Sequence, residues 1–440
     1  MTASNQVAEA SGQYLVEAAG QAVPVGYKQT EMGLIPEDWR LTTLENIARI
    51  IDPQPDHRTP PESSGGVPYI GISDFNNDKT VNWESSRKII SKAVDKQQLS
   101  FQLNSGDIIF GKIGTIGQPK FVPSVSFRYA LSANVLLIQP KIVSYFVMGW
   151  LQSNICQVAI NSELHSTSQA AFGINKMRKV LIPLPPENEQ TAIANALSDV
   201  DALIRSLEKL IAKKQAIKTA TLQQLLTGRI RLPQFALRED GTQKGYKQSE
   251  LGEIPEDWGI CELQNAVDFL DGLRKPVKSG DRAKISGIYP YYGASGIVDY
   301  VNDYIFDDDL ILLGEDGENI LSRNLPLAFR VSGKLWVNNH AHVMKPKSNF
   351  DIGYLTDFLE SLDYSLLNSG TAQPKLNKQA CLKIKVVKPT KDEQTAIATI
   401  LSDMDTEIQT LHQRLSKTRQ IKQGMMQELL TGKTRLLRGA

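Results

Sequence analysis

The clearest pattern of apolar residues along this chain is a heptad repeat that occurs twice. Apolar side chains recur at alternating spacings of four and three residues, as expected for the a and d positions of a coiled-coil helix. The first segment places them at Ile193, Leu197, Val200, Ile204, Leu207 and Ile211, and the second at Ile397, Leu401, Met404, Ile408, Leu411 and Leu415. We therefore predict two long helices, each with one apolar seam.

Proline precedes each heptad segment, and the sequence Leu-Thr-Gly follows each of them. Because glycine commonly ends a helix, we predict spacer helices over residues 187–229 and 390–433. At about 1.5 Å per residue, each helix would be roughly 60 Å long. A homodimeric coiled coil is one way to bury the seams. Pairing of the two helices within one chain is favoured, because covalent linkage gives them a high effective concentration.

A second repeat places two unlike segments in equivalent surroundings. Residues 26–39 (GYKQTEMGLIPEDW) and 245–258 (GYKQSELGEIPEDW) agree at 11 of 14 positions. Residues 40–182 and 259–385, here called the first head and the second head, follow these sequences and do not repeat. An internal pseudo-twofold axis would make the helices antiparallel, with one head at each end. Such a chain is suited to reading two unlike halves of an asymmetric target.

Both heads are predicted to be mixed α/β domains, so the whole chain falls in the α+β class. Short runs rich in β-branched residues and interrupted by glycine or proline indicate strands. They lie at residues 67–75, 106–114 and 133–141 in the first head and at residues 288–301, 308–320 and 334–347 in the second. Apolar residues at helical spacing predict one helix over residues 145–160 and another over residues 352–364.

Composition excludes several classes of protein. The 440 residues are 41% hydrophobic, enough for more than one core, and 49 basic residues balance 48 acidic ones. Any nucleic-acid surface must therefore be local: the first head has 15 basic and 10 acidic residues, and the second has 14 and 16. Cys156, Cys261 and Cys381 form no CxxC pair, which favours a reducing compartment and argues against zinc. Without a signal-peptide pattern or a long apolar stretch, we predict a cytoplasmic protein that has no membrane contact.

Two motifs that suggest chemistry also have a structural interpretation. Gly111, Gly114 and Gly117 form a GxxGxxG run, but it leads into Gln-Pro instead of a helix, which favours a surface turn over a dinucleotide loop. His340 and His342 flank one residue of a predicted strand and would face the same side. Without a third ligand pattern, hydrogen bonds to a base or within the core are favoured over a metal site.

Aromatic residues leave a similar choice. Trp39 and Trp258 end the repeated 14-residue sequences, where packing is favoured over base stacking. Tyr289, Tyr291 and Tyr292 form a cluster for which packing and DNA contact are equally open.

These features together resemble the specificity subunit of type I restriction-modification enzymes. The motifs that carry the resemblance are GYKxTExGxIPxDW at residues 26–39, Gly-Asp-Ile-Ile at residues 106–109, PPxxEQxxIA at residues 185–194 and the LLTG sequences that end both helical segments. In the second head, YYGASGIVDYV at residues 291–301, GEDGEN at residues 314–319 and WVNNHAHV at residues 336–343 resemble a recurrent target-recognition domain of that family. The resemblance extends from residue 26 to the end of the chain.

The resemblance implies two mixed α/β target-recognition domains, residues 26–186 and 245–389, separated by two long antiparallel coiled-coil helices in an internal pseudo-twofold repeat. The remaining parts are an N-terminal extension (1–25), the spacer helices (187–229 and 390–433), a linker (230–244) and a C-terminal tail (434–440).

The resemblance also implies a DNA-binding subunit instead of an enzyme. In that family each recognition domain reads one half of a bipartite double-stranded DNA target, while the helices dock two adenine-N6 methyltransferase subunits that two motor-endonuclease subunits join. The sequence is consistent with this, because it has no Asn-Pro-Pro-aromatic, Phe-x-Gly-x-Gly or GxxxxGK[ST] motif. S-adenosylmethionine, ATP and Mg²⁺ are accordingly expected in partner subunits, and this chain is expected to hold no catalytic residue, cofactor or metal.

Candidate DNA contacts are polar or basic residues in loops beside the predicted strands. Lys and Arg neutralise phosphates, and Arg, Lys, Asn, Gln and Ser read base edges. The first head offers Lys112, Arg128, Ser168, Gln169 and Lys176, and the second offers Arg274, Lys275, Arg323, His340, Gln373 and Lys378. For each of these, a solvated or structural side chain is the open alternative.

Two other functional classes are weighed against DNA reading. A protein-interaction scaffold, or a specificity subunit that has lost DNA targeting, would fit the near-neutral second head. A self-contained nuclease or methyltransferase is disfavoured by the missing motifs. Steep salt dependence would distinguish DNA binding from a scaffold, and a self-contained enzyme would be active as the purified chain.

Overall fold

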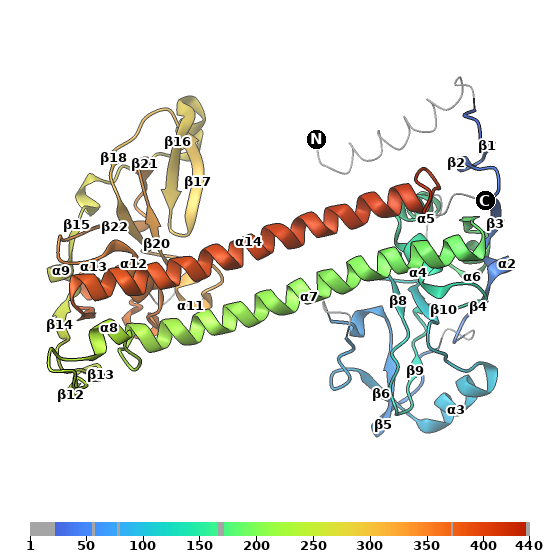
Figure 1. Cartoon of the computed structure of the whole chain (residues 1–440), viewed down its shortest axis with the longest axis horizontal. Coiled ribbons are helices and arrows are strands. Elements are labelled where there is room, and N and C mark those ends of the chain that lie inside the picture. Colours follow the sequence, from blue (N-terminus) through green and yellow to red (C-terminus); the bar gives the residue numbers. More distant parts are fainter. Residues whose placement is uncertain (1–22, 55–57, 77–79, 166–170, 371–372, 437–440) are drawn as a thin grey trace. The chain divides into compact units, whose positions relative to one another are not determined.

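A computed structural model describes residues 23–54, 58–76, 80–165, 171–370 and 373–436. The chain forms two compact units. The first comprises residues up to 209 together with those from 413 onward, and the second comprises residues 210–412. Each unit therefore contains one head, the beginning of one long helix and the end of the other (Figure 1).

The two predicted spacer helices are present as α7 (Glu187–Leu226) and α14 (Lys391–Leu429). Within the first unit they run antiparallel, because Asp201 pairs with Lys422 at 2.9 Å and Glu208 pairs with Arg419 at 2.7 Å. The pairs of the second unit are Lys214 with Glu407 at 2.7 Å and Lys218 with Asp405 at 2.6 Å. Every position of the two predicted seams is buried or half-buried.

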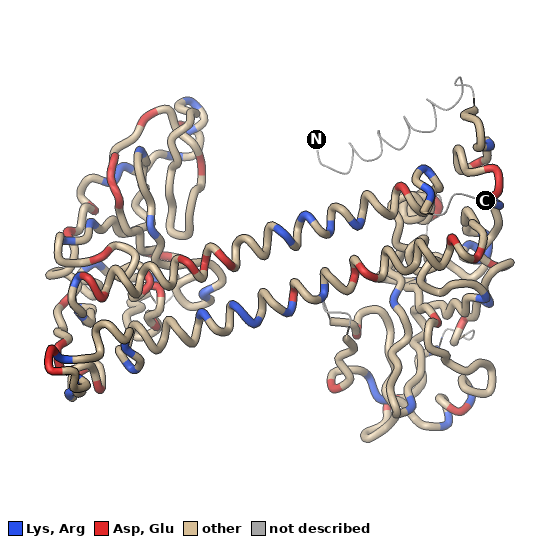
Figure 2. Tube along the Cα trace, in the orientation of Figure 1, with Lys and Arg blue, Asp and Glu red and all other residues tan. Residues whose placement is uncertain are grey.

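The charge pattern of the long helices accounts for this direction. Asp and Glu gather in the first half of each helix, and Lys and Arg gather in the second half (Figure 2). Antiparallel pairing places the acidic half of one helix beside the basic half of the other, whereas parallel pairing would oppose like charges. The acidic residues in the first turns, Glu187 and Glu189 in α7 and Asp392 and Glu393 in α14, also complement the positive end of the helix dipole.

The first head is built on a four-stranded antiparallel sheet in the order β4-β10-β7-β8. Its strands are β4 (Ala48–Ile51), β7 (Ile108–Gly111), β8 (Pro119–Phe121) and β10 (Val135–Pro140). A second sheet, β6-β5-β9, consists of β5 (Glu62–Ile70), β6 (Arg87–Ile89) and β9 (Ala130–Leu131), with β5 and β9 parallel. The helices are α2 (Leu44–Ile47), α3 (Ser91–Ser100), α4 (Ser144–Gln152), α5 (Asn154–His165) and α6 (Ile174–Arg178).

The second head repeats this topology and adds one strand to the smaller sheet. Its main antiparallel sheet, β15-β22-β19-β20, consists of β15 (Val267–Phe269), β19 (Leu310–Gly314), β20 (Ala328–Val331) and β22 (Ala341–Pro346). The other sheet, β17-β16-β21-β18, consists of β16 (Ser286–Gly293), β17 (Gly296–Val301), β18 (Phe306–Asp307) and β21 (Lys334–Val337), with β16 and β21 parallel. The helices are α9 (Leu263–Ala266), α10 (Ser279–Arg282), α11 (Asn319–Ser322), α12 (Ile352–Glu360) and α13 (Lys378–Leu382). The two heads thus share one fold.

Short paired strands surround each head in the same way. The repeated 14-residue sequences begin with the hairpins β1 (Tyr27–Thr30) with β2 (Gly33–Pro36) and β12 (Tyr246–Ser249) with β13 (Gly252–Pro255). Each head is then closed by an antiparallel pair, β3 (Arg40–Thr43) with β11 (Leu181–Leu184) and β14 (Gly259–Glu262) with β23 (Lys385–Lys388). The helix α8 (Pro233–Ala236) lies between the first spacer helix and the second hairpin.

The core of each head continues into the long helices. In the first unit, buried Trp39, Phe146 and Trp150 belong to one cluster with Leu197 of α7 and Leu430 just beyond α14. The corresponding cluster of the second unit contains Trp258, Tyr354, Leu226 and Leu401. Both tryptophans of the repeated sequences are fully buried, as the packing interpretation predicts.

One predicted helix is wrong in its extent. The helix expected over residues 145–160 is divided into α4 and α5 at Ser153, whose backbone is extended. The Ser153 hydroxyl accepts a 3.3 Å hydrogen bond from the N–H of Cys156 and thereby caps α5. Local apolar periodicity continues across this break, which is why the sequence alone does not show it.

Candidate nucleic-acid interface

Three loop segments lie side by side at one edge of the main sheet in the first head. The loop after β7 begins with Lys112, whose N–H donates to the carbonyl of Asn134 at 2.8 Å. The Lys112 carbonyl accepts from the N–H of Phe172 at 2.9 Å. The loop before β10 and the segment before α6 therefore flank the loop after β7, and together they form what we call the loop edge of the head.

The second head builds its loop edge with the same backbone hydrogen bonds. The N–H of Glu315 donates to the carbonyl of His340 at 2.8 Å, and its carbonyl accepts from Leu376 at 2.7 Å. Glu315 is therefore the structural equivalent of Lys112. Five of the predicted DNA contacts lie on or next to these segments, namely Arg274, Lys275, His340, Gln373 and Lys378.

Several of these side chains are exposed at the loop edge of the second head. Lys275 is exposed, and its carbonyl accepts a 2.6 Å hydrogen bond from Nε1 of Trp336. The His340 side chain is 49% exposed, and its Nδ1 lies 2.8 Å from Asp316. Gln373 is exposed as well. The edge thus presents an amide, an imidazole and an ammonium group, which are chemical groups that read bases or neutralise phosphates.

Lys112 lies in the loop beside a strand, as expected, but its side chain is buried there. Lys112 is only 3% exposed, and its Nζ lies 2.5 Å from Oδ2 of Asp52. An ammonium group that is buried in an ion pair would lose its partner if it moved to a phosphate. Lys112 therefore fits a structural role beneath the loop edge better than direct contact with DNA.

The Arg274 side chain is likewise mostly buried, with 14% exposed. Its Nη1 donates to Glu315 at 2.7 Å and to the carbonyl of Ala341 at 2.7 Å. Lys378 is half-buried over the ring of Phe269 at 5.3 Å. Both residues support the loop edge from within.

The remaining candidates are spread over other places. Lys176 is half-buried and donates to the carbonyl of Glu163 at 2.8 Å. Ser168 and Gln169 lie outside the described residues. Arg128 is exposed beside α3, where it pairs with Asp95 and borders a groove of about 460 Å³.

Arg323 follows α11 and lies outside the three segments of the loop edge. It ends α11 in a left-handed conformation with a φ of 51°. Its guanidinium lies 2.9 Å from Glu360 and stacks over the ring of Tyr364. These contacts place it in the packing between α11 and α12, which argues for a structural role.

The expectation that both histidines lie on one strand is wrong for His340, which lies in the turn before β22. His340 precedes β22 and is half exposed, whereas His342 lies within the strand and is 1% exposed. Burial opposes a charge on His342, but the hydrogen bond to Asp271 and the neighbouring Cys381 outweigh it and raise the pKa of His342 to about 10. In the described residues, no group of three or more His, Cys, Asp and Glu side chains is arranged to hold a metal ion.

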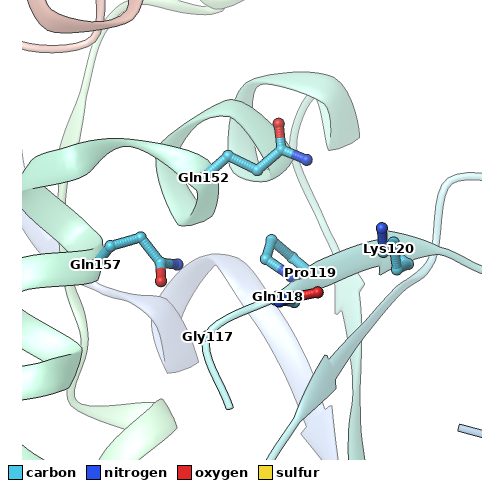
Figure 3. A pocket seen from close by; sticks show the side chains of 6 residues that line it. All are labelled: Gly117, Gln118, Pro119, Lys120, Gln152 and Gln157. Carbon is cyan, nitrogen blue, oxygen red and sulfur yellow. The ribbon is translucent and has the colours of Figure 1, made fainter. Parts of the chain in front are cut away.

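The GxxGxxG run forms a turn between two strands, as predicted. It leaves β7 at Gly111 and enters β8, and Gly114 and Gly117 have positive φ angles of 74° and 81°. Gly117 lines an open pocket of about 290 Å³ together with Gln118, Pro119, Lys120, Gln152 and Gln157 (Figure 3). The Gln157 amide donates to the carbonyl of Leu151 at 2.5 Å. Because the run does not open a helix, it lacks the geometry of a dinucleotide site.

Two residues at the loop edge were missing from the sequence-based candidates. Asp316 holds the His340 ring, and Lys375 is half exposed with its Nζ 3.4 Å from Glu315. The GEDGEN sequence that contains Asp316 indicated this loop, but only the fold shows that Asp316 pairs with His340 and that Glu315 pairs with Lys375.

The described helices include none that is long and apolar enough to cross a membrane.

Comparison with known protein families identifies the family to which this architecture belongs. Two heads of one fold, each joined to the same pair of long helices, match the model of the type I restriction modification DNA specificity domain over residues 36–219 and 255–420. The chain belongs to this family and is a specificity subunit of a type I restriction-modification system.

Relatives of known class match almost the full length of the chain. The putative type I restriction enzyme MjaX specificity subunit of Methanocaldococcus jannaschii is 25% identical over 432 residues, covering 93% of this chain and 97% of the relative. The MjaVIII specificity subunit of the same organism is 25% identical over 433 residues, covering 91% and 94%.

Solved structures show the same fold. The specificity subunit of a type I restriction-modification system from M. genitalium has a TM-score of 0.56 at 18% identity, covering 89% of this chain and 96% of that one. A chain from a structure described as the basis of complex assembly and conformational transition of the type I system has a TM-score of 0.53 at 15% identity, covering 91% and 99%. The predicted α+β architecture with two recognition domains and two long antiparallel helices is thereby confirmed.

Proposed function

We propose that this chain reads a bipartite, asymmetric double-stranded DNA target, with one half-site assigned to each head. The observation that carries the proposal is the loop edge, which both heads build with identical backbone hydrogen bonds and different side chains. At the equivalent positions Lys112 and Glu315 even the sign of the charge differs. A scaffold that the two heads share, with different polar groups at one edge, suits two readers of two different sequences.

We further propose that the long helices dock two adenine-N6 methyltransferase subunits, which two motor-endonuclease subunits join. Leu203, Leu210 and Ile217 of α7 are each about 40% exposed and lie one heptad apart, so they form a second apolar stripe outside the seam. The stripe supports docking of a helix from the methyltransferase subunit. S-adenosylmethionine, ATP and Mg²⁺ would then be bound by these partners, which perform the chemistry.

A map of N6-methyladenine tests the proposal. The chain is expressed with its methyltransferase subunit in cells without other adenine methylation, and cells lacking the chain serve as the control. We expect methylation at one bipartite motif with a fixed spacer. Replacing residues 40–182 with the first head of a related specificity subunit should change one half-site and leave the other intact. Methylation without a shared motif would contradict the proposal.

The alternative is a protein-interaction scaffold, or a specificity subunit without DNA targeting. The even balance of charges in the second head favours it. Binding of duplex DNA by the complex with the methyltransferase distinguishes the two. A DNA reader loses affinity steeply as salt rises, because phosphate contacts release counterions. A scaffold would associate with the methyltransferase but show no such DNA binding.

A further inference from the structure

The buried charge beneath the loop edge is reversed between the two heads. In the first head Lys112 pairs with Asp52, which follows β4. In the second head Asp271 follows β15 at the matching place in the sheet register, and Glu315 takes the place of Lys112. Two carboxylates therefore meet where the first head has one carboxylate and one ammonium group. Such an arrangement needs positive charge from elsewhere.

His342 supplies part of this charge. It lies on β22 at the register position that Leu136 occupies on β10. Its Nδ1 lies 2.9 Å from Oδ2 of Asp271, and its Nε2 lies 3.0 Å from the carbonyl of Leu376. A carbonyl only accepts hydrogen bonds, and so does an ionised carboxylate. Both ring nitrogens must therefore carry a hydrogen, which makes the ring an imidazolium.

Arg274 supplies the remaining positive charge and connects these buried charges to the surface. Its Nη1 donates to Glu315 at 2.7 Å, and Glu315 lies 3.4 Å from Nζ of Lys375. The loop continues from Glu315 to Asp316, which holds the exposed ring of His340 at 2.8 Å. The exposed groups of the loop edge are thus tied to a few buried charges.

We propose that His342 is a positioning residue for recognition of the second DNA half-site, an inference that rests on the proposed function. His342 is 1% exposed and does not reach DNA itself. Through Leu376 it fixes the segment that carries Gln373, and together with Arg274 it fixes the loop beside His340. At the equivalent positions the first head has Lys112 paired with Asp52 and no histidine, so the role of His342 is specific to the second head.

Two variants separate positioning from charge balance. H342L removes the imidazolium, and D271N/H342L removes the imidazolium together with the carboxylate that it neutralises, while the Arg274–Glu315 pair stays in place. Each variant and the unaltered chain are expressed with the methyltransferase subunit, and methylated adenines are mapped across the genome. Thermal unfolding of the purified complexes measures folding separately. The first half-site of each molecule serves as an internal control.

We expect both variants to accept sites with one mismatch in the second half-site at least ~10-fold more often than the unaltered chain does, since each base pair of a site contributes about 1–3 kcal/mol. Discrimination at the first half-site should stay unchanged. The double variant should recover the thermal stability of the unaltered complex but not its discrimination. If H342L fails to fold, discrimination at the second half-site by the double variant alone tests the inference.

Two results would overturn the inference. One is full discrimination at the second half-site by H342L, and the other is recovery of both stability and discrimination by D271N/H342L, which would reduce the network to charge balance. Failure of the proposed function is recognised separately, because the unaltered chain would then yield no bipartite motif.

Discussion

The indole nitrogen of Trp39 donates a 3.0 Å hydrogen bond to a carboxylate oxygen of Glu189, a residue 150 positions further along the chain. Glu189 is 1% exposed and also binds Arg435 at 2.7 Å. The second unit repeats the arrangement with Trp258, Glu393 and Arg231. In each unit, this Trp–Glu–Arg cluster ties the 14-residue repeat to the start of one long helix and to the segment after the other.

Arg231→Gln tests the cluster of the second unit. The substitution leaves Glu393 buried without its cation, so the free energy of unfolding should fall by about 3 kcal/mol. Urea unfolding followed by tryptophan fluorescence measures this. The double variant R231Q/E393Q removes both charges and should recover most of the loss. Arg238→Gln breaks an exposed pair with Glu256 and should change stability by less than about 1 kcal/mol. A small effect of R231Q, equal to that of R238Q, would contradict a stabilising role of the cluster.

His342 should make the stability of the second head depend on pH. Its pKa is raised from 6.5 to about 10, because burial is outweighed by its bonds to Asp271 and Cys381. The stabilisation from its charge is therefore complete below about pH 6.5, decreases as the pH rises, and is lost above about pH 10. Unfolding of the unaltered chain and of H342L is compared at about pH 6 and pH 9. The difference between them should be larger at pH 6, and a difference independent of pH would refute the assignment.

Asp357→Asn should stabilise the second unit at neutral and higher pH. Burial on α12, together with the nearby Asp405, raises the pKa of Asp357 to about 6 in spite of Lys218. The ionised carboxylate therefore destabilises the folded state. This destabilisation is complete above about pH 6 and absent below about pH 4. We expect a gain of about 2 kcal/mol at pH 8 and little change at pH 4, measured by thermal unfolding. The exposed Asp199→Asn is the control, and an equal effect at both pH values would count against burial as the cause.

Leu210→Glu tests the apolar stripe on α7. A carboxylate in the middle of the stripe should weaken association with the methyltransferase subunit, because burying an unpaired charge at an interface is costly. Arg414 occupies the equivalent position on α14 and is exposed, so Arg414→Gln is the matched control. Analytical ultracentrifugation of the purified mixtures measures the mass of the complex. An unchanged mass for L210E, with the chain folded, would place docking elsewhere.

Local sequence patterns predicted much of this architecture. The heptad seam, the repeated 14-residue sequence and the strand-like runs depend on spacing within a few residues, and helices and strands form from such spacing. The alternation of acidic and basic halves along α7 and α14 also stands in the sequence and favours antiparallel pairing. The charges of the candidate DNA contacts can also be read directly from the sequence.

The burial and the partners of those charges were decided only by the tertiary structure. Lys112 pairs with Asp52 across 60 positions, and His342 with Asp271 across 71. His340 and His342 differ in exposure because β22 begins between them, at Ala341. Whether a charged side chain lies in water or beneath a loop depends on residues that are far apart in the sequence and that the sheets bring together. A pattern that spans only a few residues cannot show such pairings.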